Sequence, residues 1–142
     1  MGLLDRIRAW GSGGDQDAPI VRSPLEQRLI ERLQDSIGDP LREDAPVRLH
    51  LRFTGEVQGV GFRWNSTWIA RDFHLTGWVM NLDDGSVEMV VQGSPKRIIM
   101  HLDKLHAYYQ RFRNRIWIEE ATELSPVEDE GEFEARYEPG VM

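Results

Sequence analysis

A glycine-rich segment followed by an arginine is the part of this sequence best suited to hold an anion. It runs from Gly55 to Arg63 and has three glycines within its first seven positions. Glycine has no Cβ, so successive backbone N–H groups can turn toward one centre and form a concave anion-binding nest. A helix that begins near Phe62 adds the partial positive charge of its N-terminus, and Arg63 adds a planar guanidinium suited to phosphate or carboxylate oxygens. The segment predicts an oxyanion site.

Two familiar phosphate-binding motifs do not match this segment. No Gly-Lys-Ser/Thr follows the glycines, which excludes a P-loop, and the Gly-x-Gly-x-x-Gly fingerprint is missing from it. A plain glycine-rich connection with an exposed arginine explains the residues equally well from glycine content alone. From the residues alone, Asn81 precedes Asp83-Asp84-Gly85, where an asparagine can simply complete a turn.

Other residue types that often carry chemistry form no pattern here. The chain has no cysteine, which excludes disulfides, thiolate metal sites and cysteine nucleophiles. Four histidines include no pair at i,i+4 spacing, so they are expected in the core or in solvent rather than on a metal: His50, His74, His101 and His106. The sequence predicts no metal site.

Hydrophobic periodicity predicts the elements that position the candidate residues. Apolar and polar residues alternate from 47 to 54, as in a strand buried on one face. Helical spacing predicts a helix over 62–73, and the segments that follow read as a second strand at 77–82, a tight turn at 83–85 and a third strand at 86–92.

The second half of this domain contains a further helix pattern and two further strand patterns. Apolar residues three and four apart predict a helix from Ser94-Pro95 to Phe112, followed by a strand at 116–121 and a short strand in which Phe133, Ala135 and Tyr137 alternate with charges. The order β-α-β-β-α-β with an added edge strand predicts an α+β ferredoxin-like sandwich, one antiparallel sheet with both helices on one face.

The polar residues of the strands predict an open sheet face. Arg48, His50 and Arg52 alternate with the apolar residues of the first strand, so the face away from the helices is expected to be left to solvent. The acidic cluster between Glu128 and Glu134 is expected to be a solvated loop that also guards a sheet edge.

The first 45 residues form an extension to the domain at 46–142. Residues 1–10 are a short amphipathic piece, residues from about 11 to 22 a flexible linker, and residues from about 24 to 37 an amphipathic helix. Ser23 caps this helix, Pro24 takes the first helical position and Glu26 completes a capping box. Its apolar stripe is expected to pack on the same chain or on a partner, and comprises Leu25, Leu29, Leu33 and Ile37.

Composition limits the partners and the location. The 142 residues carry 17 basic and 24 acidic side chains, a net charge of -7, which argues against a nucleic-acid partner because phosphate-driven binding needs a basic surface. No apolar run reaches the length of a membrane span, so no membrane partner is expected. The absence of cysteine and of a signal-peptide pattern predicts a cytoplasmic protein.

Three segments together resemble the acylphosphatase family over about residues 46–137. They are Gly55-x-Val57-Gln58-Gly59-Val60-x-Phe62-Arg63, Gly77-Trp78-Val79-x-Asn81 and Asp84-Gly85-Ser86-Val87-Glu88. The resemblance implies a small hydrolase that cleaves the carboxylic-phosphoric anhydride of acyl phosphates with no metal and no cofactor, as a monomer. It also implies that Arg63 and Asn81 are catalytic and that the phosphate-binding loop consists of Val57, Gln58, Gly59, Val60, Gly61 and Phe62.

Departures from the family pattern keep other functions open. The N-terminal extension is atypical, and the usual Gly-Pro connection after the second helix is replaced by residues 108–115. A non-catalytic anion-binding or regulatory module would keep the fold and the loop without turnover. An RNA binder of this topology would need aromatic side chains on the open sheet face, which the first and third strands lack. The acylphosphatase-like domain of a hydrogenase maturation factor would continue into cysteine zinc motifs, and this chain has no cysteine.

Overall fold

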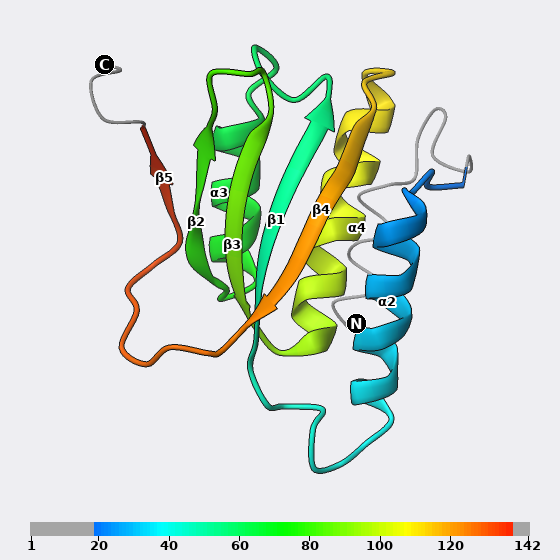
Figure 1. Ribbon diagram of the computed structural model, residues 1–142, viewed down its shortest axis with the longest axis vertical. Helices are drawn as coiled ribbons and strands as arrows, with labels where there is room; N and C mark the ends of the chain where they lie inside the picture. Colours follow the sequence, from blue (N-terminus) through cyan, green and yellow to red (C-terminus); the bar gives the residue numbers. More distant parts are fainter. Residues whose placement is uncertain (1–18, 138–142) are drawn as a thin grey trace.

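Within residues 19–137, the periodic segments of the sequence form one sheet and three helices (Figure 1). The computed structural model describes residues 19–137. The helices are α2 (Pro24–Ile37), α3 (Phe62–Asp72) and α4 (Pro95–Arg111), and the strands are β1 (Val47–Gly55), β2 (Thr76–Asn81), β3 (Val87–Gly93), β4 (Ile116–Leu124) and β5 (Glu134–Arg136). Within residues 19–137 no helix is long and apolar enough to cross a lipid bilayer. The expected segment 1–10 and most of the expected linker lie outside the described residues.

The strand order is β4-β1-β3-β2-β5. Strands β1 to β4 pair antiparallel, as the ferredoxin-like prediction requires. The prediction of an antiparallel sheet is wrong for β5, which pairs parallel to β2 with Trp78 opposite Glu134. The reason is the path of the chain. Strand β4 ends at the same end of the sheet at which β2 begins, and the segment after β4 crosses to the opposite edge of the sheet at that end (Figure 1). Strand β5 therefore starts beside the beginning of β2 and runs in the same direction.

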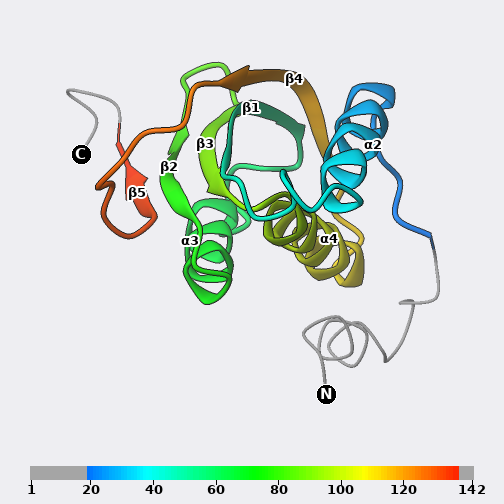
Figure 2. The same ribbon diagram turned by 90° about the horizontal axis from the view of Figure 1, so that it is seen from below.

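Helices α3 and α4 cover one face of the sheet and enclose the core (Figure 2). The inward residues of the first and third strands are buried as predicted. They meet apolar residues of both helices, so the core includes Leu49, Leu51, Phe53, Met89, Val91, Ile69, Ile98, Leu102 and Leu105. This packing fixes the ends of the strands and the start of α3, where the candidate residues lie.

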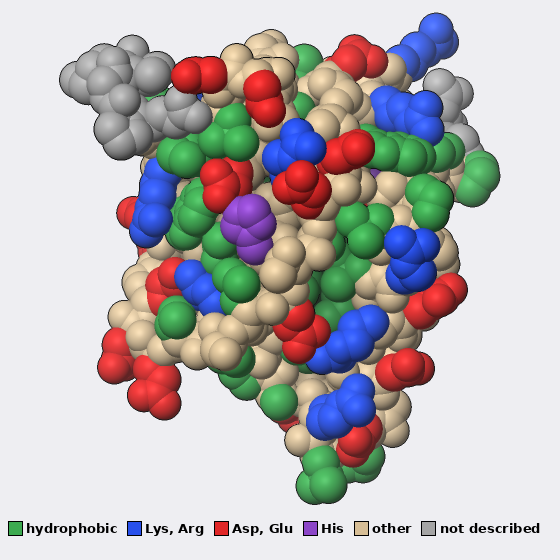
Figure 3. All heavy atoms as spheres, in the orientation of Figure 1, with side chains coloured by type: hydrophobic (Ala, Val, Ile, Leu, Met, Phe, Trp, Pro, Cys, Tyr) green, Lys and Arg blue, Asp and Glu red, His purple; other side chains and the backbone are tan. Residues whose placement is uncertain are grey.

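The opposite sheet face carries paired charges rather than free ones (Figure 3). His50 Nε2 lies 2.7 Å from Glu88 Oε1. The prediction that this face is left to solvent is wrong at Arg48, which is 9% exposed and forms two hydrogen bonds of 2.8 and 3.0 Å with Glu130. These hydrogen bonds lower the pKa of Glu130, a residue expected to be solvated. The segment between β4 and β5 therefore folds over one end of the open face.

Helix α2 lies beside α4 and the edge strand β4 (Figure 2). Ser23 Oγ accepts a 3.0 Å hydrogen bond from the Glu26 amide, so the predicted N-cap and helix are confirmed. The most buried apolar residues are Ile30 and Leu33, whereas Leu25 and Leu29 are partly buried. The buried face of α2 is thus rotated relative to the predicted stripe of Leu25, Leu29, Leu33 and Ile37. This face packs on α4 and β4 of the same chain.

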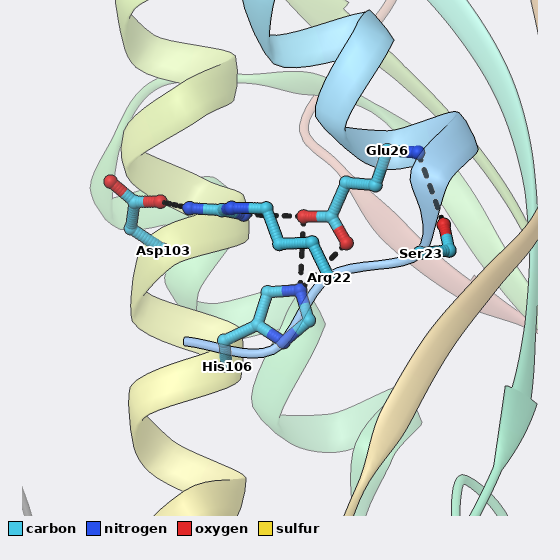
Figure 4. Close-up of polar contacts among 5 residues, drawn as sticks. All are labelled: Arg22, Ser23, Glu26, Asp103 and His106. Carbon is cyan, nitrogen blue, oxygen red and sulfur yellow. Dashed lines mark hydrogen bonds and ion pairs between the residues drawn. The ribbon is translucent and has the colours of Figure 1, made fainter. Parts of the chain in front are cut away.

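A buried ionic cluster fastens α2 to α4 (Figure 4). The Glu26 side chain is fully buried, and its oxygens lie 2.8 and 2.9 Å from His106 Nε2 on α4. Arg22 bonds to the same carboxylate and to Asp103, also on α4. The predicted capping box is therefore wrong in its second half, because the Glu26 carboxylate turns to Arg22 and His106 instead of the helix start.

We expect Glu26→Gln to lower the free energy of unfolding by about 2–3 kcal/mol, because Arg22 loses one of its two carboxylate partners and His106 loses a buried charged acceptor while the packing volume stays the same. Urea unfolding followed by circular dichroism measures the change. Glu31→Gln is the matched control, since Glu31 lies on the exposed side of the same helix and its replacement should change stability by less than about 0.5 kcal/mol. An equal effect of both variants would show that the cluster adds nothing specific.

His101 makes stability depend on pH. The ring is fully buried on α4, with Nε2 3.2 Å from the Ser66 carbonyl oxygen, and burial lowers its pKa from 6.5 to about 4. Between pH 6.5 and about pH 4, His101 is therefore protonated in the unfolded chain but neutral in the folded chain. Stability conferred by the neutral ring is complete above pH 6.5 and falls as the pH drops toward 4.

We expect the wild type to lose about 3 kcal/mol more than His101→Leu between neutral pH and pH 4, as measured by urea unfolding across that interval. Comparing the two proteins cancels the acid dependence of carboxylates such as Asp84 and Glu130, whose pKa values are lowered. His74→Gln, at an exposed histidine, should keep the wild-type slope. Parallel slopes for wild type and His101→Leu would contradict the prediction.

Candidate active site

The candidate loop joins the end of β1 to the start of α3. Gly59 and Gly61 have φ values of 77° and 74°, in the left-handed region that glycine adopts without strain. Gly61 is the N-cap residue of α3 and makes no side-chain capping bond. The first amides of α3 therefore have no side-chain acceptor at the cap, which leaves this helix end suited to an anion.

Three strand ends meet the loop at one end of the sheet (Figure 1). Strands β1 and β2 are both antiparallel to β3, and β5 is parallel to β2, so the carboxyl ends of all three point the same way. A cavity of about 280 Å³ lies there. Among the described residues it is lined by Val57, Gly59, Gly61, Phe62, Arg63, Trp64, Asn81, Ala135 and Tyr137. The structure thus brings Arg63 and Asn81 to one cavity.

Two of the predicted loop residues support the loop from outside the cavity lining. Gln58 Nε2 donates to the carbonyl oxygens of Leu82 and Ser86 at 2.7 and 2.8 Å, which ties the loop to the turn after Asn81. The Val60 carbonyl oxygen accepts a 3.2 Å hydrogen bond from the Tyr109 hydroxyl of α4. Burial raises the pKa of Tyr109 to about 12, so this hydroxyl stays protonated and can donate.

Replacement of Gln58 tests this connection between loop and turn. We expect Gln58→Met to lower the free energy of unfolding by about 1–2 kcal/mol, because methionine matches the length of glutamine but removes two part-buried hydrogen bonds, leaving each carbonyl oxygen with its backbone donor alone. Thermal or urea unfolding measures the loss. Gln34→Met, on the exposed side of α2, is the control and should be nearly neutral. Equal stabilities would mean that water replaces the amide at no cost.

Arg63 presents its guanidinium to the cavity. The residue is half-buried in the first turn of α3, and its guanidinium carbon lies 4.1 Å from the centre of the Tyr137 ring. Stacking on one face leaves the N–H groups at the rim of the guanidinium plane free to donate to an anion. No carboxylate among residues 19–137 forms an ion pair with Arg63. Its charge is therefore not neutralised by the described part of the protein.

Asn81 is the last residue of β2, and its Oδ1 atom is buried. Among the described residues no donor bonds to this oxygen. The adjoining turn is closed without the Asn81 side chain, by Leu82 N–H to the Ser86 carbonyl at 2.9 Å and by Ser86 N–H to Asp84 Oδ1 at 2.9 Å. The purely turn-forming interpretation of Asn81 therefore loses its support. A buried amide oxygen at a cavity wall is suited to accept from a water molecule or ligand.

Three residues line the cavity in addition to the predicted site residues: Trp64, Ala135 and Tyr137. Trp64 is 74% exposed, so it does not pack in the core with the apolar residues of α3. Ala135 and Tyr137 were placed on the fifth strand by their alternation. Their position at the cavity follows from the parallel pairing of β5 with β2, which no local pattern indicates.

Comparisons with known proteins add an independent finding. Residues 49–135 match the profile of the family named Acylphosphatase. The acylphosphatase of Thermococcus kodakarensis is 56% identical over 52 residues, 37% of this chain and 57% of that protein. The acylphosphatase of Marinobacter nauticus is 39% identical over 88 residues, 61% of this chain and 91% of that protein.

The fold is similar to a solved structure of the same name. The crystal structure of acylphosphatase from Bacillus subtilis aligns with a TM-score of 0.52 and 26% identity, over 64% of this chain and 99% of that one. Several sequence matches cover only part of the relative. This chain spans 57%, 64% and 48% of the length of three of the curated relatives it matches.

Proposed function

Because this chain belongs to the acylphosphatase family, we propose that it hydrolyses acyl phosphates to a carboxylate and inorganic phosphate. The observation that supports this most is the shared cavity of the glycine loop, Arg63 and Asn81. Its lining includes the cation of Arg63, the backbone of the glycine loop and the neutral amide of Asn81. An acyl phosphate needs both, a place for a charged phosphoryl group and a group that positions water.

In the proposed reaction Arg63 and the loop amides hold the phosphoryl oxygens. The leaving carboxylate is already stable, so little acid catalysis is needed, and catalysis consists mainly of positioning and of stabilising charge on the equatorial oxygens. A guanidinium with no carboxylate partner among the described residues is suited to this role, because its charge is directed to the ligand. The αL glycines allow the backbone amides to approach the same group.

Asn81 would orient the attacking water. An amide does not titrate near neutral pH, so it cannot serve as a general base, but its oxygen can accept a hydrogen bond from water and its NH2 group can donate one. Water attacks phosphorus, the bond from phosphorus to the carboxylate oxygen breaks, and the proton of the water passes to a phosphate oxygen. The buried Oδ1 of Asn81 has no described donor, and the water would supply one.

Steady-state hydrolysis of benzoyl phosphate by the full chain tests the proposal. Turnover should release benzoate and phosphate in equal amounts, and inorganic phosphate should inhibit by occupying the same cavity. A folded protein that binds phosphate without turnover would instead support the non-catalytic anion-binding module.

We further propose that the protein is a monomer. The apolar stripe of α2 is directed at α4 and β4 of the same chain, so this helix needs no second molecule to cover it. Light scattering at micromolar concentration should give the mass of one chain, about 16.4 kDa. A dimer mass would indicate that another surface mediates association.

A further inference from the structure

An exposed tryptophan stands at the mouth of the candidate cavity. Trp64 follows Arg63 in the first turn of α3 and lines the same cavity as Arg63 and Asn81. Its side chain is 74% exposed, more than that of any other aromatic residue the structure describes. Such a side chain contributes little to the core, so packing does not account for its place. An apolar group bound in the cavity would cover it.

A second aromatic residue lines the same cavity. Tyr137 is 59% exposed and stacks on the Arg63 guanidinium. Neighbouring lining residues are small or apolar, namely Val57, Phe62 and Ala135. Apart from the guanidinium, the lining therefore offers mainly aromatic and aliphatic contacts.

The charges of the cavity limit which acyl group fits. Arg63 is the one charged residue among the described residues of the lining, and the phosphoryl group would use it. An acyl group with its own carboxylate or phosphate would need a second cation, which this part of the lining does not supply. The acyl group that matches the remaining walls is uncharged.

We propose that Trp64 determines acyl specificity by stacking on the acyl group, so that the preferred substrates are acyl phosphates with a planar, uncharged acyl group such as an aromatic one. This inference rests on the proposed acylphosphatase function. An indole face offers a broad apolar surface that a benzoyl ring can cover, whereas an acetyl group is too small to cover it. Substrate discrimination then arises from the part of the substrate that does not react.

The test compares two substrates on variants of the full chain. The measured quantity is the kcat/KM for benzoyl phosphate divided by that for acetyl phosphate, which cancels changes in the shared phosphoryl chemistry. Trp64→Ala should lower this ratio about fivefold to tenfold relative to the wild type. Trp64→Phe should retain most of it, since phenylalanine keeps an aromatic face.

Phe112→Ala is the matched control. Phe112 is another exposed aromatic residue, at the end of α4 and outside the cavity lining, so its loss should leave the ratio unchanged. A Trp64→Ala ratio equal to that of the wild type, with both substrates hydrolysed, would overturn the inference and leave the proposed function standing. Hydrolysis of neither substrate by the folded wild type would overturn the proposed function, and the specificity with it.

Discussion

Arg63→Gln should lower kcat/KM for benzoyl phosphate by about a thousandfold or more. Glutamine keeps a polar side chain of similar reach but removes the positive charge and the planar fork that can grip two phosphoryl oxygens. Charge on those oxygens is what the transition state must stabilise, and a single arginine at a transferring phosphoryl group is worth roughly 10³–10⁵ in rate. The measurement is steady-state hydrolysis, with inhibition by inorganic phosphate as the second readout, and both should weaken.

Two further variants complete this test. One asks whether positive charge at position 63 is sufficient for activity, and the other asks whether the loss of any exposed arginine lowers activity. Arg63→Lys keeps the charge without the fork, so its activity should fall between those of the wild type and Arg63→Gln. Arg28→Gln removes an exposed arginine of α2 far along the chain from the loop and should leave kcat/KM unchanged. If folded Arg63→Gln retained a tenth of the wild-type rate, the assignment of Arg63 as the phosphoryl-binding group would be wrong.

Asn81→Ala is expected to lower kcat by about a hundredfold or more while the inhibition constant of phosphate stays close to its wild-type value. The variant removes the group that orients water but leaves Arg63 and the loop amides in place. The variant should therefore lose turnover but not phosphate binding, because inorganic phosphate still binds while the attacking water is no longer directed at phosphorus.

The control for Asn81 is a second asparagine outside the cavity lining. Asn114→Ala, in the connection between α4 and β4, should leave kcat unchanged. The stability of Asn81→Ala should also stay close to that of the wild type, because the β2–β3 turn is closed by backbone and Asp84 hydrogen bonds. A loss of phosphate inhibition equal to that of Arg63→Gln would show that Asn81 holds the phosphoryl group instead of the water.

Local periodicity predicted the helices and strands because each pattern depends on neighbours in the sequence. The alternation from Val47 became β1, and the apolar spacing from Ile98 became α4. The glycine loop was predictable for the same reason, since positive φ at Gly59 and Gly61 is a property of the residue type. The resemblance to the family then identified the loop, Arg63 and Asn81 as a set, and the fold brings Arg63 and Asn81 to one cavity.

Contacts between distant segments were not predictable in this way. A glutamate at the third position of a helix suits a capping box, yet Glu26 found stronger partners in Arg22 and in His106, 80 positions away. The alternation of residues predicted β5 as a strand, but it did not predict that β5 pairs with β2. This parallel pairing is what places Tyr137 against Arg63. The partners of Glu26 and of β5 cannot be predicted from local sequence, because they depend on the geometry of the whole domain.

The place of β5 in the chain has a consequence for biosynthesis. Among the described elements it is the last to leave the ribosome, and it brings Ala135 and Tyr137 to the wall of a cavity whose other residues were translated at least 50 positions earlier. A nascent chain that has emerged only through β4 can pair its four antiparallel strands but holds Arg63 without its aromatic partner. The wall that carries Ala135 and Tyr137 is therefore completed only after the four-stranded scaffold beneath it has been translated.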